Sequence, residues 1–194
     1  MNSRGDTIIE VMFSFVIFSL LTVGTYVVMN RGTQISQRSL EITLVRQQLD
    51  AQVSLVRYIK DTSPAQWSEL TSGKFLVANP IDVAGVSVDG CPTPGGRTDL
   101  TAGTNTFFMA VDKRNNIVQP VRVSNASYSV PAVYAKVDLA NSKAYGIFAQ
   151  IVRAEQNSGA NTGKAYDVYI SACWDSVGSR MPVSIGTVTR LYDK

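Results

Sequence analysis

Glu10 is the side chain with the clearest chemical role to explain, because it interrupts an otherwise apolar N-terminal stretch. On insertion scales, a carboxylate at the centre of a membrane helix costs about 2.5–3.5 kcal/mol, and less near the end of the helix. Such residues are usually functional and need a partner. None of the residues next to Glu10 is basic, so we expect its partner to lie outside this stretch.

Residue types that most catalytic sites require are scarce in this chain of 194 residues. It has no histidine, which excludes the Ser-His-Asp and Cys-His nucleophile systems. Its two cysteines are few for a zinc site, which usually has three or four nitrogen or sulfur ligands. The net charge is only +3, whereas a dedicated nucleic-acid binder usually has a strong positive field, so this class of protein is disfavoured. We therefore expect no enzyme activity, no catalytic residue, no cofactor and no metal.

A long apolar segment follows Glu10. From Val11 to Met29, nineteen consecutive residues carry no charge, and as a helix they would span roughly 28 Å, close to the hydrocarbon thickness of a bilayer. No small-x-small cleavage site follows this segment, so a cleavable secretory signal fits poorly. A plain signal anchor is the alternative.

The residues in front of the apolar segment resemble the cleavage and N-methylation site of type IV prepilins and pseudopilins. The chain opens with the basic leader MNSRG, which ends in Gly5, and Glu10 is the fifth residue after it, within the run TIIEV. The resemblance implies cleavage between Gly5 and Asp6 and methylation of the new α-amino group of Asp6. It also implies filament assembly in which Glu10 binds the α-amino group of a neighbouring subunit.

Asp6 departs from the family pattern, which most often has phenylalanine directly after the cut. Its carboxylate would lie close to its own α-ammonium group. Asp6 and Glu10 are four residues apart and share one helix face, so their like charges repel modestly. The positive end of the helix compensates both charges in part.

An amphipathic helix is predicted after Gly32. Hydrophobic residues form one stripe along it at Ile35, Ile42, Val45, Leu49, Val53, Val56 and Ile59. Ser63-Pro64 is a natural end, so a single helix from Asp6 to Asp61 is expected. Gly24 and residues 30–32 are weak points, which indicate either close packing of small residues in a membrane or local unwinding when the helix leaves the bilayer.

Residues after the helix are predicted to be rich in strands. A hairpin is expected from 106–111 and 117–123, with Pro120 on an edge strand. Three further runs alternate between apolar and polar residues: Tyr145–Ile151, Tyr166–Trp174 and Val183–Tyr192. The predicted fold class is α+β, with a long N-terminal helix packed on a C-terminal antiparallel β-sheet head. The loop 154–164 has strong turn chemistry.

Four segments are therefore expected. Residues 1–5 are the prepilin leader, and 6–31 are the transmembrane or filament-core half of the helix. Residues 32–61 are its amphipathic half, and 62–194 are a β-rich extracytoplasmic head.

Cys91 and Cys173 are 82 positions apart, in a loop and in a predicted strand. Two cysteines in an exported head most simply form one disulfide, and two unrelated buried thiols are the alternative. In the chain-entropy model, closing this loop would contribute about 4.5 kcal/mol.

The expected function is a type IV pilin-like subunit, cut by a prepilin peptidase and assembled into a bacterial cell-surface filament or pseudopilus. Its partners would be other pilin subunits, and the membrane before assembly. The alternatives are a minor pilin that binds a surface ligand or takes up DNA, and a signal-anchored domain of another activity. DNA binding would need a broad basic patch, for which the candidates are Lys113, Arg114, Lys164, Arg180 and Arg190; such residues more often form a solvated face.

Overall fold

A computed structural model of the chain describes residues 6–81, 90–101, 105–112, 115, 117–131, 133–154, 164–179 and 181–193, with side chains from residue 8 onward. Gly5, and with it the expected cleavage bond, lies outside these residues. So do residues 155–163 of the expected loop.

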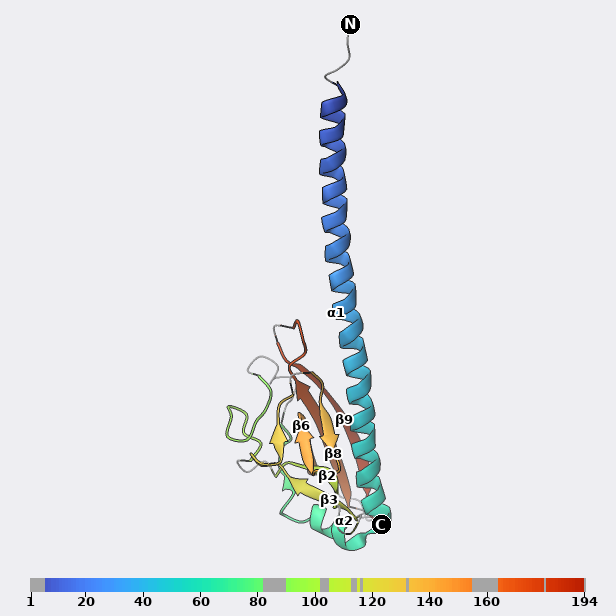
Figure 1. Ribbon diagram of the computed structural model, residues 1–194. Coiled ribbons are helices and arrows are strands. Elements are labelled where there is room, and N and C mark those ends of the chain that lie inside the picture. Colours follow the sequence, from blue (N-terminus) through green and yellow to red (C-terminus); the bar gives the residue numbers. More distant parts are fainter. Residues whose placement is uncertain are drawn as a thin grey trace. The chain divides into compact units, whose positions relative to one another are not determined.

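The first element is one uninterrupted helix, α1, which runs from Asp6 to Thr62 (Figure 1). This confirms the predicted long helix, which passes through Gly24 and residues 30–32 without a break. α1 ends before Ser63, and the short helix α2 (Pro64–Leu70) begins with proline at its first position, where the missing N–H is not needed.

The chain divides into two compact units, 1–40 and 41–194, so the boundary falls within α1. The second unit holds the last turns of α1 and all of the strands. We call it the head. Its boundary at Glu41 lies inside the segment 32–61, since the helix residues from Glu41 onward pack with the sheet.

The main sheet of the head has six strands, and its order is β3-β2-β7-β8-β9, with β1 paired to β7. All of its pairs are antiparallel except β1–β7. The predicted α+β class and the predicted hairpin are confirmed, and Pro120 lies on the edge strand β3. The strands are β1 (Leu76–Val77), β2 (Phe107–Asp112), β3 (Ile117–Arg122), β7 (Ile147–Ala154), β8 (Ala165–Trp174) and β9 (Val183–Tyr192).

A second sheet was not expected from the sequence. It has the order β4-β6-β5 and consists of β4 (Tyr128–Ser129), β5 (Lys136–Asp138) and β6 (Lys143–Tyr145). The predicted strand Tyr145–Ile151 is therefore wrong at its start, because Tyr145 belongs to β6. Gly146 separates the two strands with a φ of +74°, and a Cβ there would lie 2.1 Å from the carbonyl oxygen of Cys173. Only glycine fits this corner between the sheets.

α1 packs on one face of the main sheet through the predicted stripe. Figure 1 shows its last turns beside β8 and β9. The stripe is buried from Val45 onward, whereas Ile35, which precedes the head, is 71% exposed. The buried residues of α1 are Val45, Leu49, Val53, Val56 and Ile59, and those facing them on β8 include Val168, Ile170, Ala172 and Trp174.

The other face of the sheet is covered as well. Phe148 and Gln150 on β7 and Cys173 on β8 point away from α1, and all three are buried. Alternation therefore marks the two faces of these strands without distinguishing core from solvent. The disulfide to Cys91 holds the loop 90–101 against this second face.

Candidate functional site

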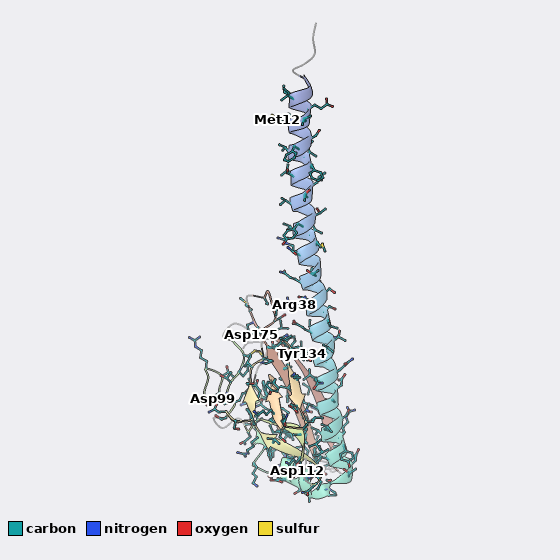
Figure 2. The ribbon with its side chains drawn as sticks, viewed as in Figure 1. Met12, Arg38, Asp99, Asp112, Tyr134 and Asp175 are labelled. Atoms are coloured by element: carbon teal, nitrogen blue, oxygen red, sulfur yellow. A yellow bond between two sulfur atoms is a disulfide. The ribbon has the colours of Figure 1, made fainter. Side chains whose placement is uncertain are left out.

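The first part of α1 displays an apolar surface with no covering. Between Ile8 and Met29, its large apolar side chains are 44–72% exposed. Figure 2 shows side chains projecting all around the helix near Met12, with nothing packed against them. An exposed apolar surface of this extent marks a membrane or protein contact. By length and composition alone, α1 could cross a membrane, as expected from the sequence.

Three hydroxyl groups of this segment are satisfied within the helix. Ser19, Thr22 and Thr25 donate hydrogen bonds to the backbone carbonyls of Phe15, Phe18 and Leu21, at 2.8 Å each. A polar group in hydrocarbon must find an internal partner, since no water is available. These three hydroxyl groups therefore need no water, as the interior of a bilayer requires.

Glu10 lies on this helix with an exposed side chain. It forms no hydrogen bond or ion pair with any described residue. The next basic residue along α1 is Arg31, 21 positions and roughly 32 Å away along the helix axis. No described residue of α1 therefore supplies a charged partner for Glu10. Asp6 begins the helix, and Gly5 precedes the described residues.

A second glutamate of the same helix, Glu41, is in the opposite situation. It is only 8% exposed, and the indole N–H of Trp174 donates to its Oε2 at 3.0 Å. The hydroxyl of Ser176 donates to the same oxygen at 2.6 Å. Glu41 therefore fixes the first turn of α1 within the head to the end of β8.

Gln52 makes the most complete polar contact between α1 and the sheet. Its Nε2 donates to the carbonyl oxygen of Met109 at 3.1 Å, and the N–H of Met109 donates to its Oε1 at 2.7 Å. β2 pairs with β7 only at Phe107 and Ala149. The backbone groups of Met109 are the next to point away from β3, and on that side they have no strand partner. The Gln52 amide takes the place of that missing strand.

Sequence reasoning missed Glu41 and Gln52, although a signal was present. Both lie four residues from a member of the apolar stripe, Glu41 before Val45 and Gln52 before Val56. A polar side chain within a buried stripe needs a partner, because burying it unpaired is unfavourable. Two further contacts flank the stripe: the N–H of Val137 donates to Gln48 at 3.3 Å, and Arg57 donates to Thr189 at 3.0 Å.

The structure contains the predicted Cys91–Cys173 disulfide, with a Cα–Cα distance of 5.5 Å. Cys173 directly precedes Trp174, whose indole binds Glu41. The crosslink therefore restrains the same end of β8 to which the helix is attached.

The candidate basic patch is not a free cationic surface at Arg190. This guanidinium forms two hydrogen bonds of 2.7 Å with the carboxylate of Asp167. These bonds favour the ionised carboxylate and lower the pKa of Asp167. Lys113, Arg114 and Arg180 lie outside the described residues, and Lys164 is exposed.

The described side chains include no group of three or more His, Cys, Asp or Glu residues arranged to hold a metal ion. Comparison of the chain with protein-family models, curated proteins and solved structures gives no match. Two features bear on function. One is the exposed apolar part of α1 that carries Glu10, and the other is the crosslinked head, which packs on α1 from Glu41 onward.

Proposed function

We propose that this chain is a type IV pilin-like subunit. A prepilin peptidase would cut it after Gly5, and its N-terminal helix would remain in the membrane until the subunit enters a surface filament or pseudopilus. The observation that supports this most is that the apolar side chains of α1 are exposed from Ile8 to Met29, whereas one face of the helix is buried from Val45 onward. One helix thus offers a surface for lipid or other helices and a surface for its own head.

Glu10 provides the chemistry of assembly in this proposal. Its carboxylate forms no hydrogen bond or ion pair with a described residue and lies near the start of an apolar helix. The α-ammonium group of a neighbouring subunit's Asp6 would supply the missing charge. A charge-assisted hydrogen bond away from water is among the stronger polar contacts. Assembly would then relieve an unfavourable charge that membrane storage leaves unpaired, which sets the register between subunits.

Intact-mass measurement of protein isolated from membranes tests the processing step. The expected product lacks the five residues of the leader, and methylation would add the mass of one methyl group. Gly5→Leu should leave the precursor uncut. A mature N-terminus beyond Met29 would contradict the proposal and indicate an ordinary secreted domain.

Glu10→Leu tests the assembly step. We expect this variant to be processed and to have a folded head, yet to enter filaments far less than the wild type. Thr22→Leu is the matched control, because it also replaces an exposed polar side chain of the same segment but removes no charge. Equal incorporation of the Glu10→Leu variant and the wild type would show that apolar packing alone drives assembly.

A further inference from the structure

Apart from the two-residue β1, which pairs only with β7, the described main sheet has the edge strands β3 and β9, and these two differ in their backbone chemistry. On β3, the N–H of Val123, directly after the strand, donates to the carbonyl oxygen of Thr106 at 3.1 Å. Antiparallel residues alternate between facing the partner strand and facing away from it. Pro120, three residues earlier, therefore has its nitrogen on the free edge. Since proline has no N–H, this edge cannot offer a continuous ladder to another strand.

The same argument gives the opposite result for β9. The N–H of Asp193 donates to the carbonyl oxygen of Lys164 at 2.7 Å, so the odd-numbered residues of β9 face β8. The backbone groups of Gly186, Val188 and Arg190 then point to the free edge. No described strand pairs with β9 there, and β9 contains no proline over its ten residues. A long, unblocked edge of this kind is a template for strand addition.

A groove runs beside this edge on the face that carries α1. It has a volume of about 390 Å³, and its walls are Arg46, Leu49 and Asp50 from α1 and Ile185, Gly186 and Thr187 from β9. Arg46 and Asp50 are exposed and form no side-chain hydrogen bond or ion pair with another described residue. The groove is thus lined by the apolar side chains of Leu49 and Ile185, together with one positive and one negative charge that form no ion pair with a described residue.

We propose that β9 binds an extended segment of a partner polypeptide, which adds to the sheet as a further strand. Main-chain hydrogen bonds to Gly186, Val188 and Arg190 would supply affinity, and the groove would supply specificity. Every second side chain of the added strand faces the groove. The matching segment carries a basic residue opposite Asp50, a small apolar residue over Leu49 and Ile185, and an acidic residue opposite Arg46.

A second copy of this chain fits the site less well. Another copy cannot offer its β3 edge, because Pro120 blocks it. An antiparallel pair of β9 strands would make the two α1 helices enter their heads from opposite directions, which two chains inserted in one membrane cannot do; this step rests on the proposed function. A parallel pair would place the second α1 on the other face, and the even-numbered residues of the second β9, which include no acidic residue to meet Arg46, would face the groove.

The direction of the added strand follows from the contacts of α1. Arg46 and Asp50 lie beside residues 185–187, and Arg57 binds Thr189, so α1 and β9 run in the same direction. An antiparallel segment, which pairs slightly more stably, would meet Asp50 before Arg46. The synthetic peptide TKTVTET has the corresponding order of charges, and TETVTKT is its control with the two charges exchanged.

The experiment measures amide hydrogen exchange of the full chain in detergent micelles by NMR, with and without each peptide. We expect TKTVTET to slow exchange at Gly186, Val188 and Arg190 by at least tenfold, and TETVTKT to have a clearly weaker effect. Val188→Pro removes one edge donor and should abolish the protection. Val188→Thr keeps the N–H and should retain it. The head tryptophans report whether both variants are folded.

A peptide version does not depend on the stability of a variant. TKTVTET methylated on the backbone nitrogens that would face β9 cannot donate to the edge and should give no protection. Equal protection by the methylated peptide, or no protection by TKTVTET itself, would overturn the proposal. Protection without peptide that disappears on dilution would also overturn it, since the occupant would then be a second copy. None of these outcomes depends on cleavage or on filament formation.

Discussion

The two parts of α1 show how one helix can serve two environments. From Ile8 to Met29 the hydroxyls of Ser19, Thr22 and Thr25 bond to the helix's own backbone, and the large apolar side chains are exposed. From Glu41 onward, one face is buried, and its polar side chains bond to strands far away in the sequence. The first part is therefore suited to surroundings without directional partners, whereas the second part is specific for one sheet.

The two glutamates of the helix make the same point. Glu10 and Glu41 have the same side chain on the same element, but among the described residues only Glu41 finds donors. A glutamate satisfied inside the head contributes to folding. A glutamate without a partner is available for contact with another molecule, as we propose for Glu10.

The largest expected effect comes from loosening the head while leaving the exposed part of the helix intact. Replacing Cys91 and Cys173 by serine opens a crosslink between positions 82 apart and should lower the free energy of unfolding by about 4.5 kcal/mol in the chain-entropy model. Urea unfolding followed by fluorescence of Trp67 and Trp174 measures the head alone. The reference is the helicity of residues 8–40 in micelles. It should be the same in the oxidised and the reduced full chain.

Gln52→Leu should have the next largest effect, because it leaves the N–H and carbonyl groups of Met109 buried without a partner on that side. An unsatisfied buried group costs about 1–3 kcal/mol, so we expect a loss of about 3 kcal/mol for the pair. Gln37→Leu is the matched control on the exposed part of α1 and should change the stability of the head by less than about 0.5 kcal/mol. Similar losses for both variants would contradict the division of the helix at Glu41.

Glu41→Ala should destabilise the head by about 2 kcal/mol, because Trp174 loses the acceptor for its buried indole N–H. Glu41→Gln keeps an acceptor oxygen and should lose less. The comparison variant is Glu10→Ala, for which urea unfolding of the head should be unchanged. If Glu10→Ala weakened the head as much as Glu41→Ala, the separate roles of the two glutamates would be wrong.

The smallest effect concerns the ion pair on the face of the sheet away from α1. The hydrogen bonds from Arg190 lower the pKa of Asp167 relative to the unfolded chain. The pair therefore contributes stability above the ordinary pKa of aspartate, about 3.9, and loses it as the pH falls through the lower folded value. Urea midpoints of the wild type and Asp167→Asn should differ at neutral pH and converge in acid. A difference that persists in acid would assign the effect to packing.

Much of the fold follows from local patterns. The uncharged run after Glu10 and the stripe ending at Ile59 specify the helix, and Ser63-Pro64 specifies its end within one residue. Alternation locates β9 at its observed bounds, and the hairpin of β2 and β3 is correct to within a residue. The disulfide was predictable because two cysteines allow only one pairing within the chain.

Other features depend on contacts between residues far apart, and no local pattern contains them. Glu41 can be buried because Trp174, 133 residues later in the sequence, brings a donor to it. Gln52 can be buried because β2 separates from β7 after Phe107, which leaves the backbone groups of Met109 free to bond to its amide. The second sheet depends on Gly146, whose backbone must pass within a short distance of Cys173.

The sequence by itself determined the long helix, the position of Glu10 before its apolar run, the strands β2, β3, β8 and β9 to within a residue, and the crosslink. These properties depend on hydrophobic periodicity, turn chemistry and cysteine count, which are local or compositional. Tertiary structure alone decided which polar residues of α1 became buried and which edge of the sheet remained open. Both outcomes depend on where hydrogen-bonding groups meet in space, because a buried polar group is stable only when its partner arrives with it.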